Sequence, residues 1–488
     1  MRKHALILAL LAPLGLALPP AAHAGWTNDP YNGMVPVCTA DGEQAHLRIC
    51  RLAYDRTLVA WGDERDFPRL YFQILDAQGI PQLQTNGLPV VDGDWITAWG
   101  NIMSSLVSDN EGGGVAVFED YRSGVRQIYG QRFDSLGNPL WGATGLPMAI
   151  WAGGQTGLKD VTTDSLGNGF IAWSKNLNPV NEIFVQKFDL ATGGRLWGEG
   201  GIRDCGDNAL CDYQQLVIDG RGGVYDAWAD TRSGWEDWHL YAQHLDAAGN
   251  ALWRPNGIPI RDPMGGNILP GDALTDGVPD GLGGGIWVYN PPIPYVSAFR
   301  LLPVGRVAWR VTCDIYFPIG IWAMLRHPQD GTVWISCEAN WPSSADYYIF
   351  RLAPRTGAPY FGEAGLSWGG NTMAATGDGV ITVRFEYGAD RSRLKARRVT
   401  SAGALAWQAF PAALDGPIQG GGSAFADPEC ASDGADGIVC AWIDLRNYAQ
   451  TGFDIYAQRV HYDGQLGSPT APVQSQPEGQ IANPPPAD

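Results

Sequence analysis

The sequence predicts an all-β protein built from about eight copies of one four-stranded antiparallel unit. Residues 128–141 form a strand pattern, an Asp-x-x-Gly turn and a second strand pattern that ends on Trp141, and the pattern recurs at 183–197 and 240–253. A second motif precedes it in each copy: a Gly-rich turn followed by a short apolar strand that ends on an aromatic residue, as in residues 109–118. No stretch keeps a helical period, which disfavours an α/β solenoid.

The copy number follows from the aromatic residue that ends the second motif. We assign this position to Trp61, Phe118, Trp173, Trp228, Trp287, Trp334, Phe385 and Trp442, a spacing of about 54 residues. Each period holds four strand patterns, which is typical of one blade of a β-propeller. The sequence therefore predicts a single propeller of eight blades. Seven remains the alternative if residues 261–341 hold one distorted blade.

The two ends of the chain are predicted to differ from the repeats. Arg2, Lys3, an apolar run and Ala24 at the end of a small-residue site predict a signal peptide over residues 1–24. The propeller is predicted over 25–467, and the Pro-rich residues 468–488 read as a disordered tail. The last copy lacks its final Trp while residues 31–57 add strand patterns at the start. We therefore expect one strand to cross between the ends and close the ring.

Composition restricts localisation and partners. No run after the leader reaches the roughly 18 apolar residues of a membrane helix, so we expect a secreted or periplasmic monomer without membrane insertion. The formal net charge of −18 argues against nucleic acid, whose backbone is bound through Lys and Arg.

Eight cysteines fall into four pairs that are close in sequence. In an exported chain an even number favours disulfides, and short-range pairing is the simplest arrangement. No C-x-x-C or His-paired cluster supports zinc, so we predict no metal site. The expected bonds are Cys38–Cys50, Cys205–Cys211, Cys313–Cys337 and Cys430–Cys440.

One copy resembles a known repeat. Asp189, Thr192, Gly193 and Trp197 fit the Asp-x-x-Thr-Gly-x-x-x-Trp repeat of pyrroloquinoline-quinone-type propellers. The same Gly-to-Trp spacing recurs in Gly137/Trp141, Gly249/Trp253, Gly305/Trp309 and Gly403/Trp407. The resemblance implies that these Trp side chains dock between adjacent blades. Quinone dehydrogenases of that family use an adjacent cysteine pair and calcium-binding carboxylates, and no two cysteines here are adjacent. The chain also resembles a group of secreted bacterial propellers of mostly unassigned function.

Polar residues near the start of the innermost strands are the first candidate site. They are Ser105, Asp160, Gln215, Asp276 and Glu429, each four residues before a turn Asp. In a propeller this strand lines the axial channel, so these residues would form a mostly acidic ring near one mouth. The alternative is an ordinary hydrated channel wall.

Tryptophans outside the repeat positions are the second candidate site. Trp95, Trp99 and Trp151 fall in connections between blades. Exposed aromatic rings beside carboxylates suit stacking on sugar rings, and the alternative is that they plug loops against the disc.

Two further motifs have simpler explanations. Asp-x-Arg recurs after the second strand in four copies, beginning at Asp63, Asp120, Asp230 and Asp444. A repeated pair favours a local ion pair over a ligand site. The Asp- and Gly-rich turns lack the alternate-residue spacing of an EF-hand loop, which leaves weak calcium binding as an alternative to plain hairpin turns.

No nucleophile-elbow or Ser-His-Asp pattern appears, and no cofactor is predicted. We therefore expect a non-catalytic exported propeller that binds a protein or glycan through its loop face. The alternative is a glycoside hydrolase or lyase that uses carboxylates such as Asp160, Asp276 and Glu429 at the channel mouth. A quinone-dependent oxidoreductase is a third reading.

Overall fold

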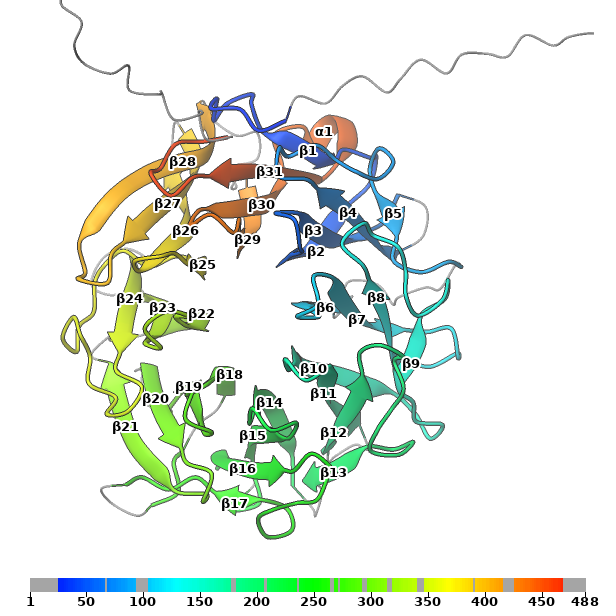
Figure 1. Ribbon diagram of the computed structural model, residues 1–488, viewed down its shortest axis with the longest axis vertical. Coiled ribbons are helices and arrows are strands. Elements are labelled where there is room, and N and C mark those ends of the chain that lie inside the picture. Colours follow the sequence, from blue (N-terminus) through cyan, green and yellow to red (C-terminus); the bar gives the residue numbers. More distant parts are fainter. Residues whose placement is uncertain are drawn as a thin grey trace, which may run out of the picture.

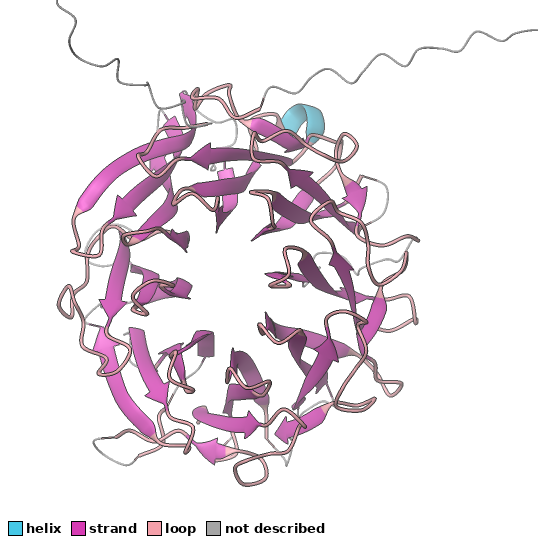
Figure 2. Cartoon of the chain, in the orientation of Figure 1, coloured by secondary structure: helices cyan, strands magenta, loops and turns pink. Residues whose placement is uncertain are grey.

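The protein is an eight-bladed β-propeller, as predicted (Figure 1). The computed structural model describes residues 25–65, 68–93, 104–176, 181–205, 209–234, 237–263, 267–270, 273–291, 296–313, 318–339, 346–388, 391–415 and 425–467. Eight antiparallel sheets surround a central axis, and strands make up nearly all regular structure (Figure 2). The predicted leader (1–24) and tail (468–488) lie outside the described residues.

Each blade begins with a strand next to the axis. These innermost strands are β2 (Gln44–Arg51), β6 (Ser104–Ser108), β10 (Thr156–Thr163), β14 (Cys211–Ile218), β18 (Ala273–Pro279), β22 (Pro318–Arg326), β25 (Thr372–Ala375) and β29 (Phe425–Ser432). The Gly-rich turn then leads to the second strands, which are β3 (Thr57–Asp63), β7 (Gly114–Asp120), β11 (Asn168–Asn176), β15 (Val224–Asp230), β19 (Gly285–Asn290), β23 (Val333–Ala339), β26 (Val380–Gly388) and β30 (Ile438–Asp444). Second strands are apolar along most of their length because blades cover both of their faces.

The third and fourth strands form the outer half of each blade. The third strands are β4 (Arg69–Leu75), β8 (Gln127–Phe133), β12 (Asn181–Asp189), β16 (His239–Leu245), β20 (Val296–Leu301), β24 (Asp346–Leu352), β27 (Arg391–Val399) and β31 (Asp454–Val460). The outermost strands are β5 (Leu88–Pro89), β9 (Leu146–Ala149), β13 (Ile202–Cys205), β17 (Ile258–Pro259), β21 (Val307–Cys313), β28 (Leu405–Asp415) and β1 (Val35–Cys38). Within the described residues the sixth sheet has three strands, and one short helix, α1 (Tyr448–Thr451), precedes β31.

The ring is closed by the N-terminal strand, as the sequence predicted. β1 pairs antiparallel with β31 and becomes the outermost strand of the last blade, so both ends of the chain share one sheet (Figure 1). This pairing covers the edge that β31 would otherwise expose.

Neighbouring blades are joined by an aromatic ring that packs on a glycine. A Cβ added at Gly249 would lie 3.0 Å from the Trp197 ring of the preceding blade, and one at Gly193 would lie 3.1 Å from the Trp141 ring. Both glycines have positive φ, so the hairpin turn itself also requires glycine. The same contact joins Trp26 to Gly79, Trp253 to Gly305, Trp309 to Gly357, Phe361 to Gly403 and Trp407 to Gly464.

The indole N–H of the docking Trp adds a hydrogen bond to the next blade. Trp141 Nε1 donates to the Leu190 carbonyl at 3.1 Å, and Trp197 Nε1 donates to the Ala247 carbonyl at 3.3 Å. Trp26, which precedes β1, donates in the same way to the Ala77 carbonyl of the first blade at 3.1 Å. The N-terminus therefore supplies the docking Trp that the last repeat lacks.

Strand register corrects three of the predicted aromatic positions. Trp61, Trp173, Trp228 and Trp442 occupy equivalent places in their second strands. In the fifth blade that place belongs to Tyr289, not Trp287. In the sixth and seventh blades Cys337 and Arg384 hold it in place of Trp334 and Phe385. The prediction failed there because the nearest aromatic was taken without knowing the register.

The docking contact makes a direct prediction for stability. Trp141→Ala removes a buried ring and its bond to the next blade, so we expect a loss of about 3–5 kcal/mol in unfolding free energy. Leu140→Ala is the matched control, because Leu140 is exposed beside it and should cost less than about 0.5 kcal/mol. Chemical denaturation measures both, and equal losses would contradict the docking role.

Candidate functional site

The predicted ring residues occupy one register on the innermost strands. Most of these strands carry a β-bulge, after which Asp160 pairs with Ala172, Gln215 with Ala227 and Asp276 with Val288. Glu429 pairs with Ala441, and Ser105 with Val117, at the corresponding place. The first blade contributes Arg48 here, opposite Ala60. A β-bulge changes the direction in which side chains point. These bulges lie toward the end of the channel at which the connections between blades run.

A pocket of about 780 Å³ opens at this end of the channel. Asp276 and Glu429 line it, whereas Asp160, Gln215 and Ser105 do not. The pocket is therefore off-centre, between the fifth, sixth, seventh, eighth and first blades. Its lining residues are His46, Arg48, Asp276, Trp322, Ala323, Met324, Glu338, Tyr347, Asn371, Thr372, Met373, Phe385, Pro428, Glu429 and Cys430.

An exposed tryptophan lies in this pocket beside a carboxylate. Trp322 is the extra residue of the β22 bulge, between Ile321 and Ala323 in register, and 47% of its surface is exposed. Its Nε1 donates to Glu338 Oε2 at 3.0 Å, which fixes the indole plane. Trp322 is one of the tryptophans outside the repeat positions, but neither it nor Glu338 was among the predicted site residues, because only the strand register shows that Trp322 occupies a bulge.

Tyr347 forms a second aromatic part of the wall. Its hydroxyl accepts a hydrogen bond from Asn371 Nδ2 at 3.1 Å, and the Arg384 guanidinium lies 5.5 Å from its ring centre. Arg384 is in turn paired with Asp346 at 3.3 Å. This network holds the tyrosine ring in place where the sixth and seventh blades meet.

Arg48 and Glu429 meet across the point where the ring closes. Arg48 Nη1 lies 3.4 Å from Glu429 Oε1 and also donates to its neighbour's carbonyl, Leu47 O, at 2.7 Å. The two side chains remain partly exposed, at 41% and 35%. Solvent screens such a pair, so its charges can exchange partners with a ligand at little cost.

The carboxylates of Asp160 and Asp276 connect adjacent blades by accepting backbone N–H groups of the following blade. Asp160 Oδ2 accepts the Leu216 N–H at 2.7 Å, and Asp276 Oδ2 accepts the Met324 N–H at 3.2 Å. Their other oxygens accept the N–H of the following residue, Val161 and Gly277 respectively. Desolvation raises the pKa of each carboxyl to about 7. Asp160 is a structural link, and Asp276 is a link that also faces the pocket.

The other predicted site residues have structural contacts or lie outside the described residues. The Gln215 carbonyl accepts the Trp287 indole N–H at 3.3 Å and so ties the fourth blade to the fifth. The Trp151 backbone exchanges two hydrogen bonds with the Gln127 side chain, and its ring packs on Gly153 and Gly154 of its own loop. Trp95 and Trp99 lie outside the described residues.

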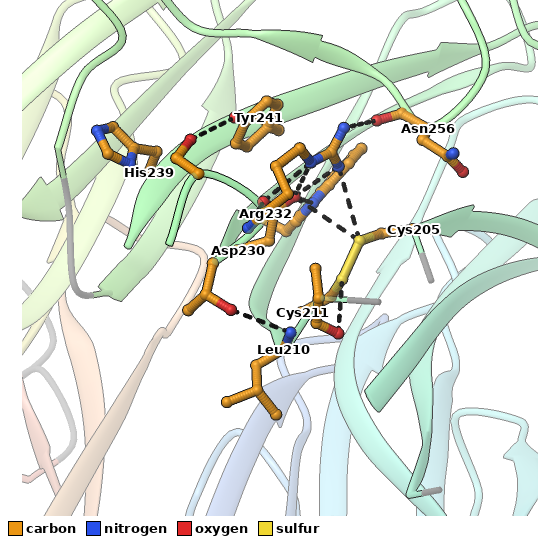
Figure 3. Close-up of polar contacts among 12 residues, drawn as sticks. Cys205, Leu210, Cys211, Asp230, Arg232, His239, Tyr241 and Asn256 are labelled. Atoms are coloured by element: carbon orange, nitrogen blue, oxygen red, sulfur yellow. Dashed lines mark hydrogen bonds and ion pairs between the residues drawn. A yellow bond between two sulfur atoms is a disulfide. The ribbon is translucent and has the colours of Figure 1, made fainter. Parts of the chain in front are cut away.

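The Asp-x-Arg motif forms a local ion pair, as its repetition suggested. Figure 3 shows the copy in the fourth blade. Asp230 accepts the Trp228 indole N–H at 2.9 Å and pairs with Arg232, which lies over the Tyr241 ring at 3.9 Å. Arg232 also donates to the Asn256 carbonyl at 2.8 Å. Asp63, Asp120 and Asp444 make the corresponding pairs with Arg65, Arg122 and Arg446.

The predicted Cys205–Cys211 disulfide is confirmed and lies beside the Asp230–Arg232 ion pair (Figure 3). The structure leaves the other six cysteines as thiols, so the predicted bonds Cys38–Cys50, Cys313–Cys337 and Cys430–Cys440 are not formed. Proximity in sequence therefore did not decide which pairs bond: Cys205 and Cys211 bond across two blades, whereas Cys430 and Cys440 are register partners within one blade and remain thiols. Burial raises the pKa of Cys38 and Cys50 to about 12, which makes these thiols unreactive.

Cys205, Cys211 and Asp230 lie close enough together to resemble a metal site. The two sulfurs are bonded to each other and Asp230 is held by Arg232, so the three cannot act as ligands in this state.

No family model and no curated protein matches the chain. Solved structures similar to it include the Dos1 propeller (10% identity, TM-score 0.43, covering 88% of this chain and 94% of that chain). The polysaccharide lyase Uly1 follows with 9% identity and a TM-score of 0.41, covering 93% and 96%. An α-L-arabinanase from Penicillium chrysogenum has 12% identity and a TM-score of 0.37, covering 65% and 97%.

In the part of the chain that the structure describes, no helix has the length and apolar character to cross a membrane.

The raised pKa values of Asp160 and Asp276 predict a pH-dependent stability. A carboxyl whose pKa is higher in the folded than in the unfolded state stabilises the fold at low pH, and this contribution is lost as the pH rises through about 7. We expect an unfolding free energy lower at pH 8.5 than at pH 5.5 by about 2 kcal/mol per group, because pH 5.5 lies about 1.5 units below the folded-state pKa. The double variant Asp160→Asn with Asp276→Asn should reduce this difference in unfolding free energy, which denaturant titrations at the two pH values measure. The prediction is contradicted if the double variant keeps the full difference.

Proposed function

We propose that the protein is an exported, non-catalytic propeller that binds a glycan in the pocket at the channel mouth. The observation that carries the proposal is the exposed Trp322 ring, held by Glu338 inside a pocket of about 780 Å³. A sugar ring presents C–H bonds on one face and hydroxyls around its rim. A fixed apolar plane beside carboxylate acceptors matches both features.

The remaining pocket residues support the same ligand class. Glu338, Glu429 and Asp276 offer acceptors for sugar hydroxyls, while Arg48 and His46 offer donors in the same pocket. Asn371 and Thr372 add neutral polar groups. Because these groups come from five blades, they surround a small ligand from several sides, as a specific site requires.

The signal-peptide pattern and the Cys205–Cys211 disulfide support a secreted or periplasmic location for this proposal. The partner would then be a glycan that the protein meets outside the cytoplasm.

A glycan array followed by titration of the best-bound oligosaccharide tests this function. We expect Trp322→Ala and Glu338→Gln each to weaken binding at least about tenfold, because each removes one half of the stacking platform. Tyr213→Ala is the matched control, since Tyr213 is also an exposed aromatic in an innermost-strand bulge but does not line the pocket. It should leave the affinity unchanged. No binding across the array, or equal effects of all three substitutions, would reject the proposal.

One observation favours cleavage of the glycan as a second candidate. Asp276, with its pKa of about 7, could donate a proton at neutral pH, and Glu429 or Glu338 in the same pocket could serve as the second carboxylate. Release of reducing ends or unsaturated products from the bound glycan would establish this activity. Under it, Glu429→Gln or Glu338→Gln, whichever residue supplies the second carboxylate, should abolish turnover, while Arg48→Gln should retain it in part. Binding without any product supports the non-catalytic function.

A further inference from the structure

One carboxylate of the channel-mouth pocket has no basic partner. Glu338 is half-buried, and within the described residues it makes no ion pair; its side chain accepts the Trp322 indole N–H at 3.0 Å. The other two carboxylates of the pocket already have partners, because Glu429 pairs with Arg48 and Asp276 accepts two backbone N–H groups. Glu338 therefore carries the negative charge that is open to a ligand.

Aromatic rings flank Glu338 on both sides. Its strand, β23, lies between β22, which carries Trp322, and β24, which carries Tyr347. Glu338 and Tyr347 are cross-strand partners, so their side chains share one face of the sheet. All three residues line the pocket. A carboxylate between two ring faces suits a cation, which gains from the opposite charge and from the π-electrons of the rings.

The Tyr347 ring already interacts with one cation. The Arg384 guanidinium lies 5.5 Å from its ring centre, and Asp346 balances that charge at 3.3 Å. The Trp322 ring and Glu338 repeat this combination of an aromatic face and a carboxylate, without a basic side chain to complete it.

A sugar that stacks on Trp322 would change the surroundings of Glu338. The carboxylate is hydrogen-bonded to the edge of that indole ring, so a stacked ligand displaces water from both groups. Removing water from an ionised carboxylate without an opposite charge costs free energy. A neutral sugar offers only hydroxyl hydrogens in return, whereas an ammonium group also supplies the charge.

We propose that the glycan bound in this pocket carries a free amino group, whose ammonium ion lies against Glu338 between the Trp322 and Tyr347 rings. This inference rests on the proposed glycan-binding function and specifies the class of sugar as an amino sugar without an N-acetyl group. The basic residues of the pocket, His46 and Arg48, belong to the first blade, and two blades separate it from the sixth. The net charge of −18 attracts a cationic oligosaccharide from a longer range.

Calorimetric titration of the full chain with three matched ligands tests the proposal. The ligands are the β-1,4-linked tetramers of glucosamine, N-acetylglucosamine and glucose, which differ only in the substituent at C2. We expect the glucosamine tetramer to bind at least about tenfold more tightly than the other two. Raising sodium chloride from about 50 mM to about 500 mM should weaken the binding of the glucosamine tetramer and narrow this preference.

Two substitutions separate recognition by Glu338 from general attraction to an acidic chain. Glu338→Gln keeps an acceptor for the Trp322 indole and should reduce the preference for glucosamine over glucose to about one. Glu363→Gln is the matched control, because it makes the same change in net charge on an exposed residue that does not line the pocket. It should keep the preference.

The outcomes distinguish this inference from the function on which it rests. Equal binding of the glucose and glucosamine tetramers, or no binding of the glucosamine tetramer beside a neutral glycan that binds, would overturn the amino-sugar proposal and leave the glycan-binding function standing. A preference that Glu338→Gln retains, or that Glu363→Gln removes to the same extent, would also overturn it. Absence of binding to every glycan would reject both.

Discussion

The contact between an aromatic ring and the turn glycine of the next blade is the interaction on which the rest of the structure depends. Each blade is too small to bury both of its faces alone, so stability comes from neighbours that cover one another. Trp141 on Gly193 and Trp197 on Gly249 show the arrangement: a flat ring, a residue without Cβ, and an indole bond to the adjoining carbonyl. Trp26 repeats it on Gly79 and makes the array a closed ring.

This constraint explains what the sequence could predict. The recurrence of an aromatic residue at the end of the second motif predicted the blade number. The spacing of Gly137 to Trp141 and its repeats predicted the antiparallel hairpins, because the docking contact tolerates few other residues. The missing final Trp also predicted a closing strand, although only the structure shows that Trp26 replaces it. Disulfide pairing was less accessible, because proximity in sequence does not decide which sulfurs meet. Cys205 and Cys211 bond between the third and fourth blades, whereas Cys38 and Cys50, on the last and first blades, remain thiols.

The candidate site was predicted only in part for a related reason. Asp276 and Glu429 could be placed near one mouth from their distance to the following turn. Trp322 and Glu338 could not, because the bulge in β22 decides which residue leaves the strand face, and no periodic signal marks a bulge.

The structure therefore combines a uniform scaffold with a few local departures from it. The Asp-x-Arg pairs and the bridging carboxylate of Asp160 belong to the scaffold, since each links neighbouring elements of the ring. The pocket around Trp322 lies where the bulge of the sixth blade departs from the repeat, and this is where we place binding.

Closure of the ring by the N-terminal strand is the central claim, and hydrogen exchange tests it most directly. Backbone amides should be compared between the chain beginning at residue 25 and one beginning at residue 40, which lacks Trp26 and β1. The account predicts that protection falls first in β31 and in the turn around Gly79, whose partners are removed, while β14 to β16 on the far side stay protected. Unchanged protection in β31 and the Gly79 turn would contradict it.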